Sequence, residues 1–485
     1  MQRRDFFKAT GALTAQTILA SALFDSLWMP TAHGSTVSVA SLSAALNPVD
    51  GIVLIPQDAQ FANYQNAFNK RTLLTPLVRV LCKTPKGVAT ALQWAQSNDV
   101  ALALRSGGHS FEGLSQTAGL AVDMRPMNQV EMDHDANGFR VGAGALLGNI
   151  YQKLSEYQRA IPAGTCPTVG ITGHTLGGGY GLLARAMGLA CDSLQSVDLV
   201  SAEGAQVTCS ETENANLFWA LRGGGAGSFG VVTNLQFKAH SLSKVLVFSM
   251  GWKVKPQMAS ELMATFQQWA PQSPKEITSL MKVSKGQNGM INVRCIGQSV
   301  GSEATLRTEL AQLTAVETSP INMQSLDFMS AVRHFGGSFE PSSVFMKGKS
   351  DYLKSVMPAN GRQDFLHQLP EGIDVIFDSY GGAIRDLADH ESAFAHRENT
   401  LSSLQYYTQW STPVQAAGKL ANLRQFHEAM RPYMSGGAYF NYCDLDLKNA
   451  PQAYWGSNLS RLIEVKNQYD PKNFFRHAQS IPLKA

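Results

Sequence analysis

Two glycine-rich segments constrain this chain more than any other feature of its sequence. Residues 105–110 read Arg-Ser-Gly-Gly-His-Ser and follow a short apolar segment, Val100 to Leu104. Residues 164–170 read Gly-Thr-Cys-Pro-Thr-Val-Gly. Because glycine has no Cβ, such loops let backbone N–H groups approach a bulky anionic ligand. We therefore predict a pyrophosphate cradle, with His109 and Cys166 as candidate ligands or covalent attachment points.

The elements predicted around the first loop have the order expected of a cofactor domain. Thr75 to Cys82 alternates apolar and basic residues like a short strand. Thr84 and Pro85 then suit the N-cap and the first position of a helix that runs to Asn98. Further strands are predicted over residues 119–124 and 138–141, and an amphipathic helix over 145–157. A hairpin over residues 196–210 would turn at Glu203-Gly204.

Gly225 to Gly230 matches the dinucleotide fingerprint G-x-G-x-x-G literally. A genuine fingerprint follows a strand and opens a helix, because the helix N-terminus must face the pyrophosphate. Here a predicted helix, residues 213–222, comes before the motif and a predicted strand, 231–239, comes after it. The order is reversed, so we reject a Rossmann site.

Length and charge narrow the classes of protein further. A chain of 485 residues favours two domains. Charged residues make up 16% of the chain, below the roughly 25% of typical domains, which favours a large buried volume. The net charge is +3, and no long run of lysine and arginine is present. Nucleic acid is therefore not an expected partner.

The N-terminus resembles an export signal. Residues 3–8 read Arg-Arg-Asp-Phe-Phe-Lys and precede a mildly apolar stretch, with small residues near position 32. We predict a twin-arginine signal peptide over residues 1–34 and a periplasmic or secreted location. The alternative is a basic N-terminal helix. The apolar stretch is too short and too polar for a stable membrane anchor.

The six cysteines form no C-x-x-C pair, and we expect neither a disulfide framework nor a metal site. A disulfide between Cys191 and Cys209 stays open, because the sequence does not test its geometry.

From about residue 245 the pattern changes to long strands and amphipathic helices, which predicts a second domain with a sheet covered by helices. Residues 404–410 read Leu-Gln-Tyr-Tyr-Thr-Gln-Trp. Such a strand is either an exposed sheet edge or a surface that stacks on a sugar and hydrogen-bonds to it. The second interpretation makes Gln405, Tyr407 and Gln409 candidate substrate-binding residues.

Both glycine-rich motifs, together with the punctuating residues of the tail between Tyr454 and Ile481, resemble the berberine bridge enzyme-like FAD-linked oxidases, a group that includes oligosaccharide oxidases. The resemblance runs from about Thr75 to Ile481. It implies an α+β fold with a two-part FAD-binding domain of the PCMH type over residues 40–244. A substrate domain with an antiparallel sheet covered by helices would follow over 245–434, and a C-terminal element over 435–485 would return to the FAD domain.

In that family FAD is bonded twice, so the resemblance implies that His109 bonds the flavin 8α carbon and Cys166 bonds C6. A satisfied loop histidine and a buried structural thiol are the alternatives for these two residues. The remaining cofactor residues implied by the resemblance are Arg105, Ser106, Gly107, Gly108, Ser110, Gly164, Val169, Gly170, Gly173, His174, Gly178, Gly179, Gly181, Val232 and Asn441.

Oxidising an alcohol requires a base within hydrogen-bond reach of the hydroxyl. In several family members this base is a tyrosine of a Tyr-x-Asn-Tyr motif, which Tyr439 and Tyr442 match here. The resemblance makes Tyr442 the candidate base and Asp378 a candidate partner; core packing is the alternative for each tyrosine. Two residues depart from the usual pattern: Phe111 stands where many members have tyrosine, and Cys443 where proline is common.

These observations predict a secreted oxidase that acts on a sugar or oligosaccharide hydroxyl at C1, with O2 as acceptor and hydrogen peroxide as product. An oxidase or dehydrogenase of an aromatic or polyketide-like alcohol is the alternative within enzymes. A non-catalytic protein that binds carbohydrate or flavin is the alternative outside them. The sequence leaves the substrate, the electron acceptor and the oligomeric state open.

Overall fold

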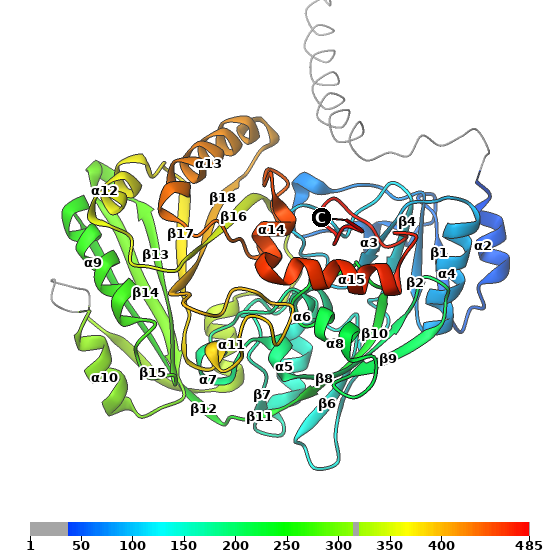
Figure 1. Cartoon of the computed structure of the whole chain (residues 1–485), viewed down its shortest axis with the longest axis horizontal. Coiled ribbons are helices and arrows are strands. Elements are labelled where there is room, and N and C mark those ends of the chain that lie inside the picture. The colour runs from blue at the N-terminus through cyan, green and yellow to red at the C-terminus, as the bar shows by residue number, and fades with distance from the viewer. Residues whose placement is uncertain (1–36, 314–319, 485) are drawn as a thin grey trace, which may run out of the picture. The chain divides into compact units, whose positions relative to one another are not determined.

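Four β-sheets organise the part of the chain that the computed structural model describes, residues 37–313 and 320–484 (Figure 1). The four-stranded and five-stranded sheets use residues up to Lys238, and the seven-stranded sheet begins at Lys244. Strands β7 (Arg159–Ala160) and β11 (His240–Ser241) form a separate antiparallel pair. The predicted signal peptide lies outside the described residues.

The four-stranded sheet supports the first glycine-rich loop. Helix α4 (Pro85–Ser97) joins the second strand to the third, and the Thr84 hydroxyl caps it by accepting a hydrogen bond from the Gly87 N–H at 3.2 Å. Strand β3 pairs in parallel with β4, so the chain enters the 105–110 loop from the carboxyl end of β3. In order across the sheet, the strands are β1 (Gly51–Leu54), β2 (Val78–Cys82), β4 (Leu120–Asp123) and β3 (Leu102–Arg105).

The five-stranded sheet is antiparallel and contains the predicted hairpin. Its turn includes Gly204 at a φ of 81°. Helix α8 (Ala215–Leu221) precedes the Gly225–Gly230 motif and a strand follows it, so the rejection of a Rossmann site is confirmed. In order across the sheet, the strands are β5 (Val130–Met132), β6 (Gly138–Gly142), β10 (Val231–Lys238), β8 (Leu194–Val200) and β9 (Gln206–Ser210).

The seven-stranded sheet is antiparallel throughout, and helices α9 (Pro256–Trp269), α12 (Ala359–Gln368) and α13 (Ala416–Met430) cover one of its faces (Figure 1). Apolar side chains of the strands and helices form one core there. The predicted α+β fold with a helix-covered antiparallel sheet is confirmed. In order across the sheet, the strands are β15 (Asn322–Asp327), β12 (Lys244–Val254), β14 (Ile291–Ser299), β13 (Ile277–Lys285), β17 (Ile373–Ser379), β18 (Ser402–Trp410) and β16 (Phe345–Leu353).

Residues from the N-terminal part of the chain cover the outer edge of β16. The Asn69 side chain donates to the Met346 carbonyl at 3.1 Å and accepts from the Met346 N–H at 3.4 Å. The Lys70 N–H donates to the Val344 carbonyl at 2.8 Å. Asn69 thus bonds to this strand much as a neighbouring strand would.

The C-terminal element, with α14 (Ala450–Trp455) and α15 (Leu459–Tyr469), packs back against the sequence around α8 (Figure 1). The buried Lys466 ammonium donates to the Ser228 carbonyl at 2.7 Å, to Asp470 at 2.6 Å and to the Phe475 carbonyl at 2.7 Å. One buried cation therefore ties the end of the chain to residue 228.

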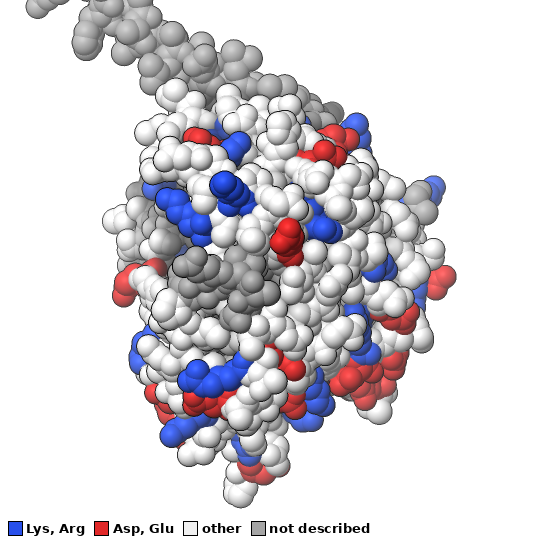
Figure 2. Space-filling view, turned by 90° about the vertical axis from the view of Figure 1, so that its left-hand side faces the viewer, with Lys and Arg blue, Asp and Glu red and all other residues white. Residues whose placement is uncertain are grey.

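Charged side chains of both signs are interspersed on the surface seen in Figure 2. Within residues 37–313 and 320–484, no helix is long and apolar enough to cross a bilayer. All six cysteines are free, so the disulfide left open between Cys191 and Cys209 is absent from the structure.

Candidate active site

The two glycine-rich loops touch through their backbones. A Cβ added to Gly107 would lie 2.3 Å from the Gly170 nitrogen, and a Cβ on Gly170 would lie 2.3 Å from the Gly107 nitrogen. No side chain larger than hydrogen fits at either position without moving backbone. The contact brings the loop that carries His109 against the loop that carries Cys166.

The His109 side chain is held between Thr168 of the second loop and Phe68. Its Nε2 lies 3.0 Å from the Thr168 hydroxyl, and its ring stacks on Phe68 with the ring centroids 4.5 Å apart. Burial, helped by the nearby Arg105 charge, lowers the pKa of His109 to about 4, so the imidazole is neutral near pH 7. Sequence analysis missed Phe68, which lies far from any motif.

Cys166 differs from the other five cysteines, since it is exposed and they are all buried. Its loop is fixed by backbone bonds: the Gly148 N–H donates to the Pro167 carbonyl at 2.8 Å, and the Leu147 N–H donates to the Val169 carbonyl at 2.9 Å. The thiol is thus accessible on a well-held loop, which argues against the alternative of a buried structural cysteine.

The 105–110 loop fits an anionic cofactor. Among the described residues, the backbone N–H groups of Ser106 to Ser110 donate to no protein acceptor. Buried Arg105 also leaves Nε and Nη1 without a hydrogen-bond partner. Successive free N–H groups form a concavity that binds phosphate oxygens. The residues present therefore fit the pyrophosphate of a dinucleotide.

A surplus of positive charge lies beneath this loop. Arg79 and Arg125 bind the buried Asp123 carboxylate, with nitrogen–oxygen distances of 2.8 and 2.5 Å, and Arg105 approaches it to 4.0 Å. Three guanidinium groups thus share one carboxylate. Burial, with the charge of Arg125, lowers the pKa of Arg105 to about 9. This surplus complements a negatively charged ligand.

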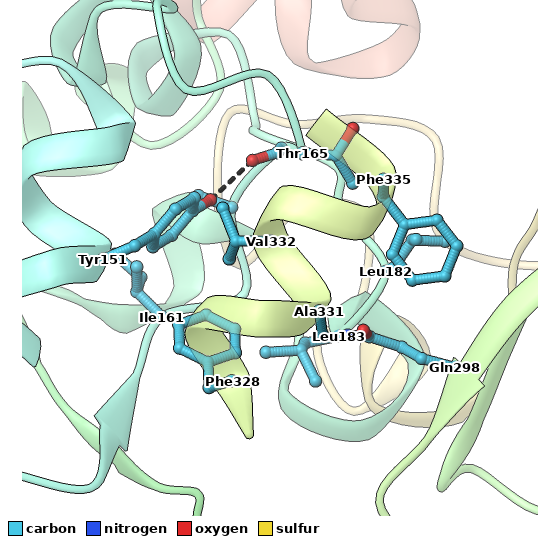
Figure 3. Close-up of a pocket in the computed structure, with 12 residues that line it drawn as sticks. Tyr151, Ile161, Thr165, Leu182, Leu183, Gln298, Phe328, Ala331, Val332 and Phe335 are labelled. Atoms are coloured by element: carbon cyan, nitrogen blue, oxygen red, sulfur yellow. Dashed lines mark hydrogen bonds between the residues drawn. The ribbon is translucent and has the colours of Figure 1, made fainter. Parts of the chain in front are cut away.

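The loop of Cys166 also rests on an apolar pocket (Figure 3). The Tyr151 hydroxyl donates to the Gly164 carbonyl at 2.5 Å. Helix α11 (Phe328–Gly336), which precedes β16, lines the same pocket, and a Cβ on Gly336 would lie 2.3 Å from the Thr165 carbonyl oxygen. Residues distant in sequence thus support the thiol loop, and no motif signalled them.

Tyr439 joins the C-terminal element to a further glycine-rich segment, Gly177 to Gly181. Its hydroxyl accepts hydrogen bonds from the N–H groups of Gly179 and Tyr180, both at 3.0 Å, and from the Asn441 amide at 2.9 Å. Asn441 also donates to the His174 carbonyl at 2.9 Å. These three donors act to lower the pKa of Tyr439, but burial outweighs them and raises it to about 12. Tyr439 thus ties the C-terminal element to the backbone of Gly179 and Tyr180.

Buried Asp378 and partly buried Tyr442 form a pair capable of accepting a proton. Asp378 is the next-to-last residue of strand β17 and is 4% exposed. Burial raises the pKa of its carboxyl to about 7, although the hydrogen bond from Tyr442 opposes the shift. Burial and the Asp378 charge also raise the pKa of Tyr442 well above its ordinary value. The carboxyl therefore titrates near neutrality, while the phenol stays protonated.

Phe111 connects this pair to β18, the strand that carries the predicted substrate-binding residues. Its ring stacks on Tyr442 with the centroids 5.6 Å apart and lies 6.4 Å from the Tyr407 ring. On β18, the partly or fully exposed Gln405, Tyr407 and Gln409 alternate with buried residues and therefore share one face. The three predicted substrate residues thus lie on the same face, and the middle one adjoins Phe111.

The other predicted cofactor residues occupy varied positions. Val232 is buried in β10, opposite Leu199 of β8. The His174 ring accepts from the Gly164 N–H at 2.9 Å. A Cβ on Gly173 would meet nothing within 4 Å, whereas one on Gly181 would lie 1.9 Å from the Ala163 carbonyl oxygen. Gly178 and Gly179 adopt φ angles of 112° and 87°.

Comparison with known proteins assigns this architecture. Residues 76–210 match the model of an FAD binding domain, and residues 438–482 match the berberine and berberine-like model. An uncharacterized FAD-linked oxidoreductase of Bacillus subtilis, YgaK, is 33% identical over 89% of this chain and 97% of its own length. The chitooligosaccharide oxidase of Gibberella zeae is 31% identical over 93% and 97%.

A monolignol oxidoreductase of Arabidopsis thaliana, AtBBE-like 13, is 31% identical over 81% of this chain and 82% of its own. Among solved structures, Physcomitrella patens BBE-like 1 superposes with a TM-score of 0.85 at 31% identity, covering 92% of this chain and 99% of that one.

The cradle, the helix-covered sheet and these matches define an FAD-linked oxidoreductase. The chain belongs to the berberine bridge enzyme-like family.

Proposed function

We propose that this protein oxidises a sugar or oligosaccharide at its C1 hydroxyl, with FAD bonded through His109 and Cys166 and with O2 as the final acceptor. The observation that supports this most directly is the Asp378–Tyr442 pair, which adjoins both the histidine loop and the polar face of β18 through Phe111. The similarity to a chitooligosaccharide oxidase supports the substrate class.

When bound, FAD supplies the acceptor for the hydride that leaves the substrate carbon. Tyr442 would receive the hydroxyl proton of the substrate as its own proton passes to the Asp378 carboxylate. Because the pKa of Asp378 is about 7, this carboxylate is ionised in a substantial fraction of molecules at neutral pH. Gln405 and Tyr407 would orient the sugar, by hydrogen bonding and by stacking.

The state of the two candidate side chains supports the proposed covalent attachment. His109 is neutral near pH 7 and therefore has a free ring nitrogen, and Cys166 is the exposed thiol of the chain. Attachment at two points would retain the cofactor in a groove open to a bulky substrate. The unpaired N–H groups of Ser106 to Ser110 would hold its pyrophosphate.

An oxidase or dehydrogenase of an aromatic alcohol is the second candidate function. The cluster of Phe111, Tyr407 and Tyr442 rings favours a flat apolar substrate, and one relative is a monolignol oxidoreductase. A binding protein without turnover is the third, and the intact Asp378–Tyr442 pair argues against it.

One experiment separates the three candidates. The purified protein is mixed without oxygen with a panel of oligosaccharides and aromatic alcohols, flavin bleaching is followed, and peroxide is measured after oxygen is admitted. Bleaching and peroxide with the sugars are expected. Reduction only by aromatic alcohols would favour the second function, and binding without bleaching the third. Peptide mass analysis that found flavin on neither His109 nor Cys166 would refute the attachment.

Export by the twin-arginine pathway is part of the same proposal, since that pathway moves folded proteins and the cofactor can be installed beforehand. Its test is the distribution of the protein between cytoplasm and periplasm when Arg3 and Arg4 are replaced by lysine.

A further inference from the structure

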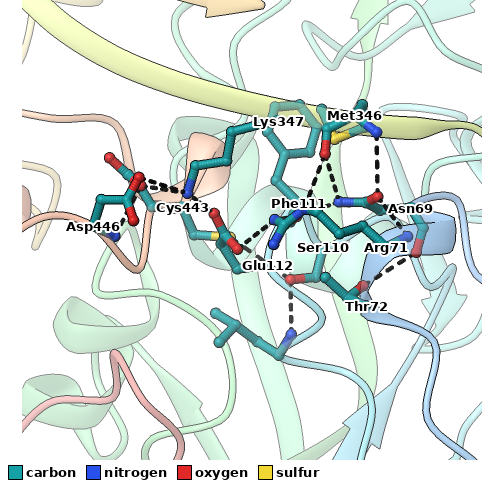
Figure 4. A network of polar contacts seen from close by, with 12 residues as sticks. Asn69, Arg71, Thr72, Ser110, Phe111, Glu112, Met346, Lys347, Cys443 and Asp446 are labelled. Carbon is teal, nitrogen blue, oxygen red and sulfur yellow. Dashed lines mark hydrogen bonds and ion pairs between the residues drawn. The ribbon is translucent and has the colours of Figure 1, made fainter. Parts of the chain in front are cut away.

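A buried network of charged side chains joins three segments of the candidate site (Figure 4). Glu112 follows the His109 loop, Asp444 follows Tyr442, and two lysines project from β16, the strand that pairs with β18. The network consists of Arg71, Glu112, Lys347, Lys349, Asp444 and Asp446.

Lys347 is the bridge in this network. Its ammonium donates to the Glu112 carboxylate and to Asp444 Oδ1, the latter at 2.6 Å. The side chains of Lys347, Glu112 and Asp444 are 4%, 1% and 5% exposed. Lys349 donates to Asp444 Oδ2 at 2.6 Å and to Asp446 at 2.9 Å. Among the described contacts, Lys347 alone reaches both Glu112 and Asp444.

The charges stabilise one another in the ionised state. Burial acts to lower the pKa of Lys347, but the Glu112 and Asp444 carboxylates outweigh it and raise that pKa. Burial acts to raise the pKa of Asp444, and the two lysines reverse this and hold it low. Removing one member would leave a buried charge uncompensated. The network therefore resists changes in the separation of the segments that it joins.

The direct contacts between residues 110–112 and residues 442–443 are less directional. Phe111 stacks on Tyr442, and the Ser110 hydroxyl lies 3.6 Å from the Cys443 sulfur. Phe111 and Cys443 are the two residues at which the sequence departs from the usual family pattern. A ring contact and a weak sulfur hydrogen bond tolerate sliding more readily than charged hydrogen bonds do.

We propose that Lys347 is a positioning residue that holds the His109 loop in register with Tyr442 by binding Glu112 and Asp444 at once. The inference rests on the proposed function for the roles of His109 and Tyr442. Lys347 itself touches no reacting group: it sets the separation between the cofactor attachment point and the proton acceptor.

The chain offers a matched pair of variants. Lys347→Met and Lys349→Met each remove one buried ammonium from the same strand, and each takes one partner from Asp444; only the first cuts the link to Glu112. Amide hydrogen exchange is measured on peptides covering residues 105–112 and 440–446 in the FAD-loaded protein, in which the cofactor pyrophosphate would protect the N–H groups of Ser106 to Ser110. Lys347→Met should speed exchange about 10-fold in both peptides, and Lys349→Met only in the second.

Equal exchange in the 105–112 peptide of the two variants would overturn the proposal. Glu112→Gln cuts the same link from the other end with an uncharged side chain of similar shape, and it replaces Lys347→Met if that variant does not fold. It should reproduce the faster exchange in the 105–112 peptide; wild-type exchange there would also overturn the proposal. This readout needs no turnover, so it stands even if the proposed reaction is wrong.

Kinetics and attachment provide a second test. Lys347→Met should lower kcat at least about 10-fold with little change in KM, and should lower the fraction of His109 peptide that carries flavin. Lys347→Arg should restore part of both losses because it keeps the charge. A Glu112→Gln/Lys347→Met double variant should lose no more than Lys347→Met alone. Additive losses, or equal losses in Lys347→Met and Lys349→Met, would mean that Lys347 contributes only general stability.

Discussion

The two sides of the candidate site are constructed differently. On the cofactor side, backbone meets backbone: Gly107 lies against Gly170, and consecutive N–H groups point to no protein acceptor. On the substrate side, side chains project from strands of one sheet: Asp378 from β17, and Gln405 and Tyr407 from β18.

Because of this difference, we expect substitutions on the two sides to affect different properties of the protein. The cofactor side depends on chain conformation, so most substitutions there act on folding and on loading of the cofactor. The substrate side depends on side chains whose strands are held by the helix-covered core, so substitutions there change the chemistry and leave the fold intact. Four predictions test this contrast.

The largest effect is expected from Gly107→Ala. Its Cβ would lie 2.3 Å from the Gly170 nitrogen, so one of the two loops must move. We expect loss of nearly all FAD content and a fall of about 1–3 kcal/mol in the free energy of unfolding, by analogy with overpacking. Absorbance and denaturant unfolding measure both.

The control for this variant is Gly418→Ala on the exposed side of α13, where an added Cβ meets nothing within 4 Å. It should keep full FAD content and gain up to about 1 kcal/mol in stability. Full FAD content in Gly107→Ala would mean that FAD binding does not require the close contact between Gly107 and Gly170.

Tyr442→Phe should have the next largest effect. Without the hydroxyl beside Asp378, the rate of flavin reduction should fall about 10²–10⁴-fold, while FAD content and stability stay near wild type. Stopped-flow absorbance measures the rate.

Tyr439→Phe is the comparison for this variant. It leaves the donors on Gly179, Tyr180 and Asn441 without their acceptor and should cost about 1–3 kcal/mol of stability. A full reduction rate in Tyr442→Phe, together with a lost rate in Tyr439→Phe, would reverse the assignment of the base.

The pH dependence should reveal Asp378 in two opposite ways. Its pKa is raised from 3.8 to about 7 in the folded protein. In the proposed reaction the ionised Asp378 carboxylate takes the proton from Tyr442, so kcat should rise with pH through about 7. Between pH 3.8 and 7 the folded state retains a proton that the unfolded state has released, so stability should fall with rising pH over this range.

Asp378→Asn should abolish both pH trends. Thermal unfolding at several pH values measures the trend in stability, and a profile of kcat against pH measures the trend in rate. An unchanged stability slope in this variant would mean that another group titrates in the same window.

Gln405→Leu should have the smallest effect. Loss of one substrate hydrogen bond should raise KM about 10-fold, with kcat within a few fold of wild type. Gln257→Leu on the exposed surface of α9 is the control and should leave KM unchanged. If Gln405→Leu lowered FAD content instead, the polar face of β18 would belong to the cofactor side.

Sequence predicted local structure well, because local residues determine it. The Thr84 cap, the Gly204 turn and the two glycine-rich loops depend on neighbours within a few positions. The loops' motifs also identified the cofactor class, since nearly all of the cradle is contained in two short segments.

Long-range partners were not predictable in this way. Phe68 beneath His109 and Lys347 between two carboxylates lie in segments without any distinguishing pattern. Their proximity depends on how segments far apart in the sequence pack together, which periodicity does not encode. Sequence also could not distinguish Tyr439 from Tyr442, because the difference lies in the backbone donors that surround the first hydroxyl.

The covered border of β16 has a consequence for the protein in solution. An unpaired strand at the margin of a large sheet is a template on which a second molecule can add its own strand. Here the carboxamide of Asn69 already occupies backbone groups of Met346. Asn69→Ala should therefore favour self-association and precipitation on heating.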